Sequence, residues 1–321
     1  MSIAAIYDVP APAKLNLYLH VVGRRADGMH LIESLMVLID WCDTIHVELR
    51  PDGLLRRHDT AAALPADDLT LRAARALQAA SGIPLGVDIT VDKQVPWGAG
   101  LGGGSSDAAS TLLALNRLWG LDWPLERLLP IGLALGADVP FFLAGTNAVA
   151  AGIGERLVPA DVAPAWFAVV KPAAQLATGE VFARPEVAAR VAAARIAGFS
   201  EAIPGVDGVP GALGKENGKA GPRLAEGFGT NDLQAAAEGL CPDVERAASA
   251  LSRAFGNSRM TGSGSAVFAR AGSGTTPSAA MPSDWPPGWS GRMCRSLERH
   301  PLADWAGRGA FDSRTGREGS R

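Results

Sequence analysis

The chain has 321 residues and a mass of 33.2 kDa, which suits two domains that each bury a core of their own. Hydrophobic residues make up 47% of the chain and charged residues 20%, and the formal net charge is −3. This composition excludes general disorder and a broad basic surface, so we expect a small-molecule partner and no nucleic acid. The three cysteines are far apart and include no Cys-x-x-Cys pair, which indicates neither a disulfide framework nor a zinc site.

The sequence contains no apolar run of the roughly 20 residues that a membrane span needs. Its first residues lack the basic and apolar regions of a secretion signal. We therefore expect a cytoplasmic protein without a membrane partner. Whether it is a monomer or a homodimer stays open.

In chain order, the first predicted elements are two strands, LNLYLHVV at 15–22 and TIHVEL at 44–49. Both alternate as half-buried strands do, and the Asp-Gly turn signal in the RRADGMH stretch between them favours antiparallel pairing. Residues 69–82 then carry Leu and Ala at helical spacing, with a glycine as the stop. Residues 87–91, VDITV, return to the period of a strand.

A loop dense in glycine follows that strand, within VPWGAGLGGGSSDAAS at 95–110. Five of the seven residues from 98 to 104 are glycine, and such density needs a compensating use, such as close approach of the backbone to a ligand. Residues 107–119 predict an alanine-rich helix, so the loop joins a strand to a helix start. Unpaired N–H groups and the helix dipole make such a junction a phosphate site.

Three other interpretations of this loop are weaker. The Walker A pattern G-x-x-x-x-G-K-[ST] is absent from the sequence. Gly98, Gly100 and Gly103 do satisfy G-x-G-x-x-G, but a dinucleotide fold also needs an acidic residue at the end of a second strand. Asp122 lies between two predicted helices instead. A glycine turn that binds no ligand is the remaining structural alternative.

The second half of the chain predicts a second domain that begins near residue 160. A helix at 125–135 runs into GADVPFF, and a strand is predicted at 166–172. Further on, the pattern predicts a flexible insertion at 198–229 and two helices at 231–240 and 242–255. A glycine turn before a strand follows at 261–265, then a flexible connection at 271–288 and a disordered tail at 307–321.

Several motifs together resemble a known family, the GHMP kinases. PWGAGLGGGSSDAA resembles the ATP-binding motif of that family. Further motifs resemble others of the family in the same order, namely APAKLNLYLHVVGRRADGMH, LGADVPFF, ATGEVF, SRMTGSGSAVFA and the closing strand RSLERHPL. The resemblance covers most of residues 9–183 and 229–305. Within the family, the sequence most resembles the kinases that phosphorylate the 2-hydroxyl of 4-diphosphocytidyl-2-C-methyl-D-erythritol in non-mevalonate isoprenoid synthesis.

This resemblance implies an α+β fold of two domains with the active site between them. Residues 1–160 would form an N-terminal ribosomal-protein-S5-like domain that holds ATP. Residues 161–306 would form a C-terminal ferredoxin-like domain that closes over the substrate. It also implies Mg²⁺, and direct transfer of the phosphoryl group without a phosphoenzyme.

The resemblance places Lys14 and Asp138 at the catalytic positions of the family. The aspartate would take the proton of the substrate hydroxyl, and the lysine would steady that hydroxyl, because a nearby ammonium keeps a carboxylate ionised and able to accept a proton. The structural alternatives are a solvated lysine at a strand start and an aspartate that caps a helix or sits in a turn.

The resemblance assigns the ATP phosphates to the glycine loop. The backbone of the loop would donate its N–H groups, and Ser105 and Ser106 could add hydroxyl donors or a magnesium ligand, although the protein ligands of the metal stay open. A helix N-cap is the alternative for Ser106 and Asp107. The predicted nucleotide-binding residues are Pro96, Trp97, Gly98, Ala99, Gly100, Leu101, Gly102, Gly103, Gly104, Ser105 and Ser106.

The cytidine diphosphate end of the substrate is assigned by the same resemblance to Asn16, Met29, His30, Thr178 and Phe182. A polar position on a strand face and a turn histidine are the alternatives for the first and third of these. Met29 departs from the tyrosine usual in the family, which gives up an aromatic contact worth about 0.5–1.5 kcal/mol.

Two other functions stay open at this stage. A GHMP kinase for another small alcohol, such as mevalonate or homoserine, is disfavoured by the combination of Lys14, Asn16 and His30. A catalytically silent nucleotide-binding regulator is disfavoured because Lys14 and Asp138 are both present.

Overall fold

The computed structural model describes residues 3–60, 65–196 and 229–306. The insertion predicted at 198–229, apart from its last residue, and the tail predicted at 307–321 lie outside these ranges. The elements in chain order are β1 Ala5–Arg24, β2 His30–Arg50, β3 Leu55–Asp59, α1 Leu69–Ser81, β4 Gly86–Asp92, α2 Gly103–Leu118, α3 Leu125–Leu135, α4 Val139–Ala144, β5 Ala148–Ala151, β6 Arg156–Pro159, β7 Trp166–Lys171, α5 Thr178–Phe182, α6 Pro185–Ile196, α7 Gln234–Leu240, α8 Pro242–Phe255, β8 Arg259–Met260, β9 Val267–Gly272 and β10 Ser290–Arg295.

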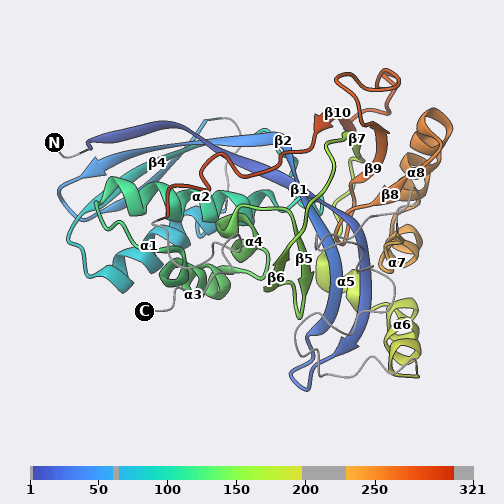
Figure 1. The fold of residues 1–321 in the computed structure, drawn as a ribbon, viewed down its shortest axis with the longest axis horizontal. Coiled ribbons are helices and arrows are strands. Elements are labelled where there is room, and N and C mark those ends of the chain that lie inside the picture. The colour runs from blue at the N-terminus through green and yellow to red at the C-terminus, as the bar shows by residue number, and fades with distance from the viewer. Residues whose placement is uncertain (1–2, 61–64, 197–228, 307–321) are drawn as a thin grey trace, which may run out of the picture.

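A long ribbon of β1 and β2 runs through both lobes of the molecule (Figure 1). The two strands pair antiparallel from Ala5 opposite Glu48 to Arg24 opposite His30. The predicted strands and their antiparallel pairing are confirmed, but both strands are longer than predicted: residues 15–21 lie opposite 32–37, and residues 44–49 form the far end of β2. The middle of β1 is buried on both faces, which removes the alternation that would have marked its true length.

The first lobe is a sheet covered on one face by helices. Its strand order is β3-β4-β2-β5-β6, with β1 paired to β2, and β3 and β4 form its parallel pair. In Figure 1 the helices α1 to α4 lie together below this sheet. Leu77 on α1, Leu112 on α2 and Phe141 on α4 are fully buried in the resulting core. The helices predicted at 69–82 and 125–135 are confirmed.

The second lobe is an antiparallel sheet of order β10-β7-β9-β8, with α8 packed against β9. A separate apolar layer joins the two lobes. It contains Leu15 and Val37 of the ribbon, Leu101 of the glycine loop, and Phe167 and Phe268 of the second sheet. The ribbon of the first sheet and the second sheet therefore pack in one buried interface, which supports the α+β architecture expected for the chain.

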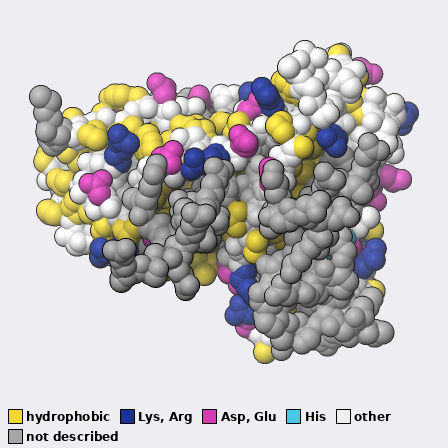
Figure 2. Space-filling view, in the orientation of Figure 1, with side chains coloured by type: hydrophobic (Ala, Val, Ile, Leu, Met, Phe, Trp, Pro, Cys, Tyr) yellow, Lys and Arg dark blue, Asp and Glu magenta, His cyan; other side chains and the backbone are white. Residues whose placement is uncertain are grey.

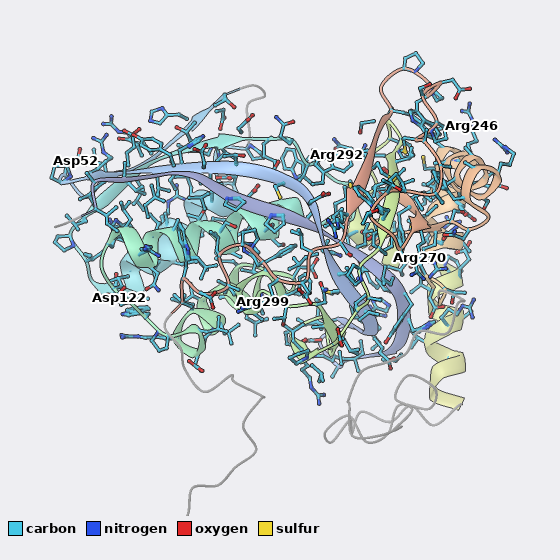
Figure 3. All side chains as sticks on the ribbon, turned by 45° about the horizontal axis from the view of Figure 1, so that its top comes forward. Asp52, Asp122, Arg246, Arg270, Arg292 and Arg299 are labelled. Carbon is cyan, nitrogen blue, oxygen red and sulfur yellow. The ribbon has the colours of Figure 1, made fainter. Side chains whose placement is uncertain are left out.

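After β10 the chain returns to the first lobe. The N–H of Leu297 donates to the carbonyl of Leu38 at 2.8 Å, and the N–H of His300 donates to that of Gly145 at 2.8 Å. Figure 3 shows Arg299 beside the helices of the first lobe, far from Arg246 on α8. Residues 295–302, expected as a closing strand, form isolated bridges after the end of β10. The predicted second domain, 161–306, thus ends in a segment that packs on the first lobe.

Charged side chains of both signs are scattered over the part of the surface coloured by type in Figure 2, and neither sign gathers there in a broad patch. No helix among the described residues has the length and apolar character to cross a membrane.

His300 holds this returning segment in place. The side chain is 2% exposed, its Nδ1 accepts a hydrogen bond from the N–H of Leu302 at 3.0 Å, and its Nε2 lies 3.5 Å from Ser110 Oγ. Burial lowers the pKa of His300 to about 4 from its model-compound value of 6.5. The folded protein therefore keeps this imidazole neutral.

We expect His300 to make the protein less stable in mild acid. Because the folded pKa is lower than the unfolded one, its contribution is complete above pH 6.5 and is lost as the pH falls towards 4, by about 3 kcal/mol in total. Urea unfolding at pH 7 and pH 4.5 should show a smaller acid-induced loss of unfolding free energy in His300→Asn than in the wild type. Equal losses in the two proteins would contradict the assignment.

Candidate active site

A cavity of about 1070 Å³ lies between the lobes. It is lined by β1, the β1–β2 turn, the glycine loop, the start of α4, α5 and the second glycine turn at 262–264. Of the predicted site residues, only Ser106 is absent from its lining. Segments from both ends of the chain therefore meet in one space.

The glycine loop delivers a helix N-terminus to this cavity. Gly102 is the N-cap of α2 in the left-handed conformation, with φ of 73°. Helix α2 then begins at Gly103, four residues earlier than the predicted start at Asp107, so the N-cap alternative for Ser106 and Asp107 is wrong. Gly103 and Gly104 adopt helical backbone once Gly102 has made the turn. The spacing of apolar residues did not predict this earlier start, because glycine has no side chain to show a period. No side chain caps this helix, and its first N–H groups face the cavity side.

Two glycine turns pack backbone against backbone. A Cβ on Gly100, whose φ is +73°, would lie 2.2 Å from the carbonyl oxygen of Thr261. The N–H of Ala266 donates to the carbonyl of Ala99 at 3.1 Å. The glycine turn at 261–265 therefore fixes the position of the glycine loop against the second lobe.

Lys14 and Asp138 meet at the wall of the cavity. Lys14 Nζ lies 3.5 Å from Asp138 Oδ2. Lys14 is 3% exposed, which rules out a solvated lysine, whereas the side chain of Asp138 is 30% exposed. Asp138 precedes α4, yet its carboxylate makes no capping hydrogen bond to that helix in the described chain. The pair can thus face a ligand together.

Asn16 holds Lys14 in place. Its Oδ1 accepts a hydrogen bond from Lys14 Nζ at 2.6 Å, and its Nδ2 donates to Ser34 Oγ at 2.7 Å. Its backbone N–H donates to Thr261 Oγ1 at 2.9 Å. At 1% exposure, this geometry supports a positioning role for Asn16 more directly than the expected contact with substrate.

The two serines of the loop differ. Ser105 lines the cavity, and its Oγ lies 3.8 Å from the point where a Cβ on Gly136 would be, two residues before Asp138. Ser106, one residue further along α2, is fully buried, and its Oγ has no hydrogen-bond partner among the described residues. Only Ser105 is therefore placed to give a hydroxyl to a ligand in the cavity.

The other predicted substrate residues also line the cavity, from the β1–β2 turn and α5. His30 stacks on Phe182 with ring centroids 4.8 Å apart. Burial, and to a lesser extent Arg24, lower the pKa of His30, so its ring is neutral at pH 7. Thr178 Oγ1 lies 2.9 Å from Ser263 Oγ, and Met29 is 48% exposed beside the ring pair.

The structure also brings residues into this region that the sequence patterns did not single out. Lys93 and Arg24 line the cavity, and Thr261 and Ser34 complete the hydrogen bonds of Asn16. Lys93 stands directly before the glycine loop, which was the one local signal for it. Arg24 and Thr261 lie within motifs noted in the sequence but were not assigned a role there, and Ser34 on β2 carried no signal of its own.

The fold and this site define a kinase of the GHMP class. Sequence profiles for the GHMP kinases N terminal domain and the GHMP kinases C terminal match residues 68–146 and 212–280. A protein of Methylibium petroleiphilum named 4-diphosphocytidyl-2-C-methyl-D-erythritol kinase is 57% identical, over 96% of this chain and all of the relative. The namesake of Variovorax paradoxus is 52% identical, over 94% and 99%. The chain belongs to the 4-diphosphocytidyl-2-C-methyl-D-erythritol kinases.

Solved structures agree with this placement. The crystal structure of a 4-(cytidine 5'-diphospho)-2C-methyl-D-erythritol kinase superposes with a TM-score of 0.61 at 33% identity, over 82% of this chain and 89% of that one. The Methanococcus jannaschii mevalonate kinase gives a TM-score of 0.57 at 12% identity, over 92% and 99%, which shows a shared fold alone. The resemblance noted in the sequence is confirmed.

The contact between the two glycine turns predicts different effects for two Gly→Ala changes at similar backbone angles. Gly100 and Gly120 have φ of 73° and 62°, but a Cβ on Gly120 would meet nothing within 4 Å. We expect Gly120→Ala to lower the unfolding free energy by about 1 kcal/mol. Gly100→Ala should cost more and weaken binding of an ATP analogue. Urea unfolding and calorimetry would measure both, and equal losses in the two variants would contradict the contact.

Proposed function

We propose that this chain transfers the γ-phosphoryl group of ATP to the 2-hydroxyl of 4-diphosphocytidyl-2-C-methyl-D-erythritol, a step in the synthesis of isoprenoid precursors. The observation that carries the proposal is the Lys14–Asp138 pair in the wall of a cavity that also contains the glycine loop. A base, a cation and a phosphate site in one space are what phosphoryl transfer to an alcohol requires.

Asp138 is the general base in this proposal. Its partly exposed carboxylate takes the proton of the 2-hydroxyl as the oxygen of that hydroxyl bonds to the γ-phosphorus and ADP leaves. Lys14, held by Asn16, hydrogen-bonds the same oxygen and offsets the negative charge that gathers on it. No covalent intermediate on the protein is needed.

The glycine loop and the first turn of α2 hold the triphosphate. Backbone N–H groups and the positive end of the helix dipole supply donors without a side chain between them and the phosphate oxygens. Lys14 packs under this turn, since a Cβ on Gly102 would lie 3.1 Å from Lys14 Cγ. The Lys14–Asp138 pair and the phosphate site are therefore fixed relative to one another.

Mg²⁺ fits this site as an ion carried mainly by the nucleotide. No group of three metal-binding His, Cys, Asp or Glu residues exists in the described ranges, which suits an ion that keeps most of its water and phosphate ligands. Ser105 is the oxygen donor that would hold it, because it lines the cavity in the first turn of α2. When bound, it neutralises charge on the β- and γ-phosphates.

The cytidine end of the substrate lies against His30, Phe182 and Thr178 in this proposal. The stacked rings of His30 and Phe182 give an aromatic surface for the cytosine ring, and the neutral imidazole of His30 can both donate and accept a hydrogen bond. The cavity volume of about 1070 Å³ lies just above the range of about 300–1,000 Å³ for single-ligand sites. It therefore has room for a nucleotide-linked alcohol beside ATP.

The proposed function is tested by ADP release with a panel of alcohols. We expect turnover with 4-diphosphocytidyl-2-C-methyl-D-erythritol and much less with mevalonate or homoserine. Asp138→Asn should lower kcat by about 10²- to 10⁴-fold and leave the affinity for an ATP analogue unchanged. Full turnover in that variant would refute the base assignment. Nucleotide binding without turnover on any alcohol would favour the regulator.

Met29 gives a separate prediction about substrate affinity. Restoring an aromatic ring beside His30 and Phe182 should add a stacking contact for the cytosine. We therefore expect Met29→Tyr to lower the KM for the cytidylyl substrate by about 2- to 10-fold, with the KM for ATP unchanged. An unchanged KM for the cytidylyl substrate would show that another residue already makes this contact.

A further inference from the structure

A cluster of three charged side chains lies under the glycine loop. Asp43 on β2 is 0% exposed, and its carboxylate pairs with Lys93 Nζ. The same ammonium lies 2.6 Å from Asp107 Oδ2 in α2. Asp43 belongs to β2, Lys93 lies between the end of β4 and the glycine loop, and Asp107 belongs to α2, the helix that follows the loop.

Asp43 is the centre of this cluster. Its Oδ1 accepts hydrogen bonds from the backbone N–H groups of Gln94 at 2.6 Å and Val95 at 2.7 Å. Its Oδ2 would lie 3.5 Å from a Cβ on Gly103, the first residue of α2. One carboxylate therefore holds the start of the glycine loop and lies against its end.

Lys93 links Asp43 to α2, because its ammonium pairs with both Asp43 and Asp107. Burial lowers the pKa of Lys93, but the attraction of Asp107 and Asp43 outweighs it and raises that pKa, so the ammonium stays charged. Burial, and then the neighbouring Asp43, raise the pKa of Asp107.

We propose that Asp43 is a positioning residue for the nucleotide: it holds the start of the 96–102 loop at Gln94 and Val95 and, through Lys93, ties that start to Asp107 of α2, which keeps the backbone N–H groups of the loop in phosphate-binding geometry. The inference rests on the proposed function in taking this loop as the ATP site. Asp43 itself is fully buried and is not part of the cavity wall. Its effect on catalysis is therefore indirect, through preorganised donors.

This role differs from a merely structural one in what it changes. The substrate end of the cavity, with His30 and Phe182, makes no contact with the cluster, so loss of Asp43 should weaken nucleotide binding selectively. Asp40 provides a matched control on the same strand. Its Oδ1 accepts a hydrogen bond from the N–H of Arg295 at 2.9 Å, on the β10 side and away from the loop.

The experiment compares Asp43→Ala, Asp43→Asn and Asp40→Asn with the wild-type chain. Calorimetry gives the Kd of a non-hydrolysable ATP analogue, steady-state kinetics give kcat and the KM for each substrate, and thermal unfolding reports folding. Asp43→Ala should raise the Kd and the KM for ATP by about 10- to 100-fold, with the KM for the alcohol within about twofold. Asp43→Asn keeps an acceptor for Gln94 and Val95 and should show a smaller rise. Asp40→Asn should bind the analogue as the wild type does.

Wild-type affinity for the analogue in both folded Asp43 variants would overturn the inference, as would equal rises in the two KM values. If Asp43→Ala does not fold, the Kd of Asp43→Asn decides alone, and a wild-type value there overturns the inference. A wild-type chain that binds the analogue but phosphorylates no alcohol would refute the proposed function, while the Kd comparison would still decide the role of Asp43.

Discussion

The close contact between the two glycine turns is the constraint on which this active site depends. Gly100 leaves no room for a side chain against Thr261, and a Cβ on Gly262 would lie 2.8 Å from the carbonyl oxygen of Gly100. The contact joins the nucleotide loop of the first lobe to the second lobe without any intervening side chain. It also places Thr261 where its hydroxyl accepts the N–H of Asn16, which in turn holds Lys14. The glycine loop, the Lys14–Asp138 pair and the cavity wall at 262–264 are thus held in fixed positions relative to one another.

The β1–β2 ribbon also fixes these positions. A single strand pair contributes Lys14 and Asn16 to the cavity, Asp43 beneath the loop and apolar residues to all three buried clusters. Because residues of the ribbon are buried against both lobes, a shift of one lobe against the other would disturb the Lys14–Asp138 pair and the contacts of Asp43 together. The returning segment around His300 adds a further tie between the end of the second lobe and the first.

Local patterns predicted several parts of this molecule well. The helices at α1 and α3 and the strand at β7 appear where periodicity placed them, because amphipathic spacing and flanking glycines act over a few residues. The predicted start of α2 was wrong, and the full lengths of β1 and β2 were not predicted. In both cases the deciding contacts come from elsewhere: Gly102 turns against Phe142 and Lys14, and β1 is covered on both faces by the two lobes. Ser106 was placed in the site by its motif, but helix geometry turns its hydroxyl into the core.

The sequence by itself determined the class of enzyme and the chemistry available to it, because glycine spacing, a basic residue and an acidic residue in family motifs are local properties of the chain. Only the tertiary structure decided which of these residues act together. Lys14 and Asp138, distant in the chain, are brought to 3.5 Å because β1 and α4 both pack against α2, and Asn16 becomes a partner of Lys14 rather than a free amide. Asp43 acquires its role in the same way, since a buried carboxylate is stable only where distant N–H groups and an ammonium converge on it.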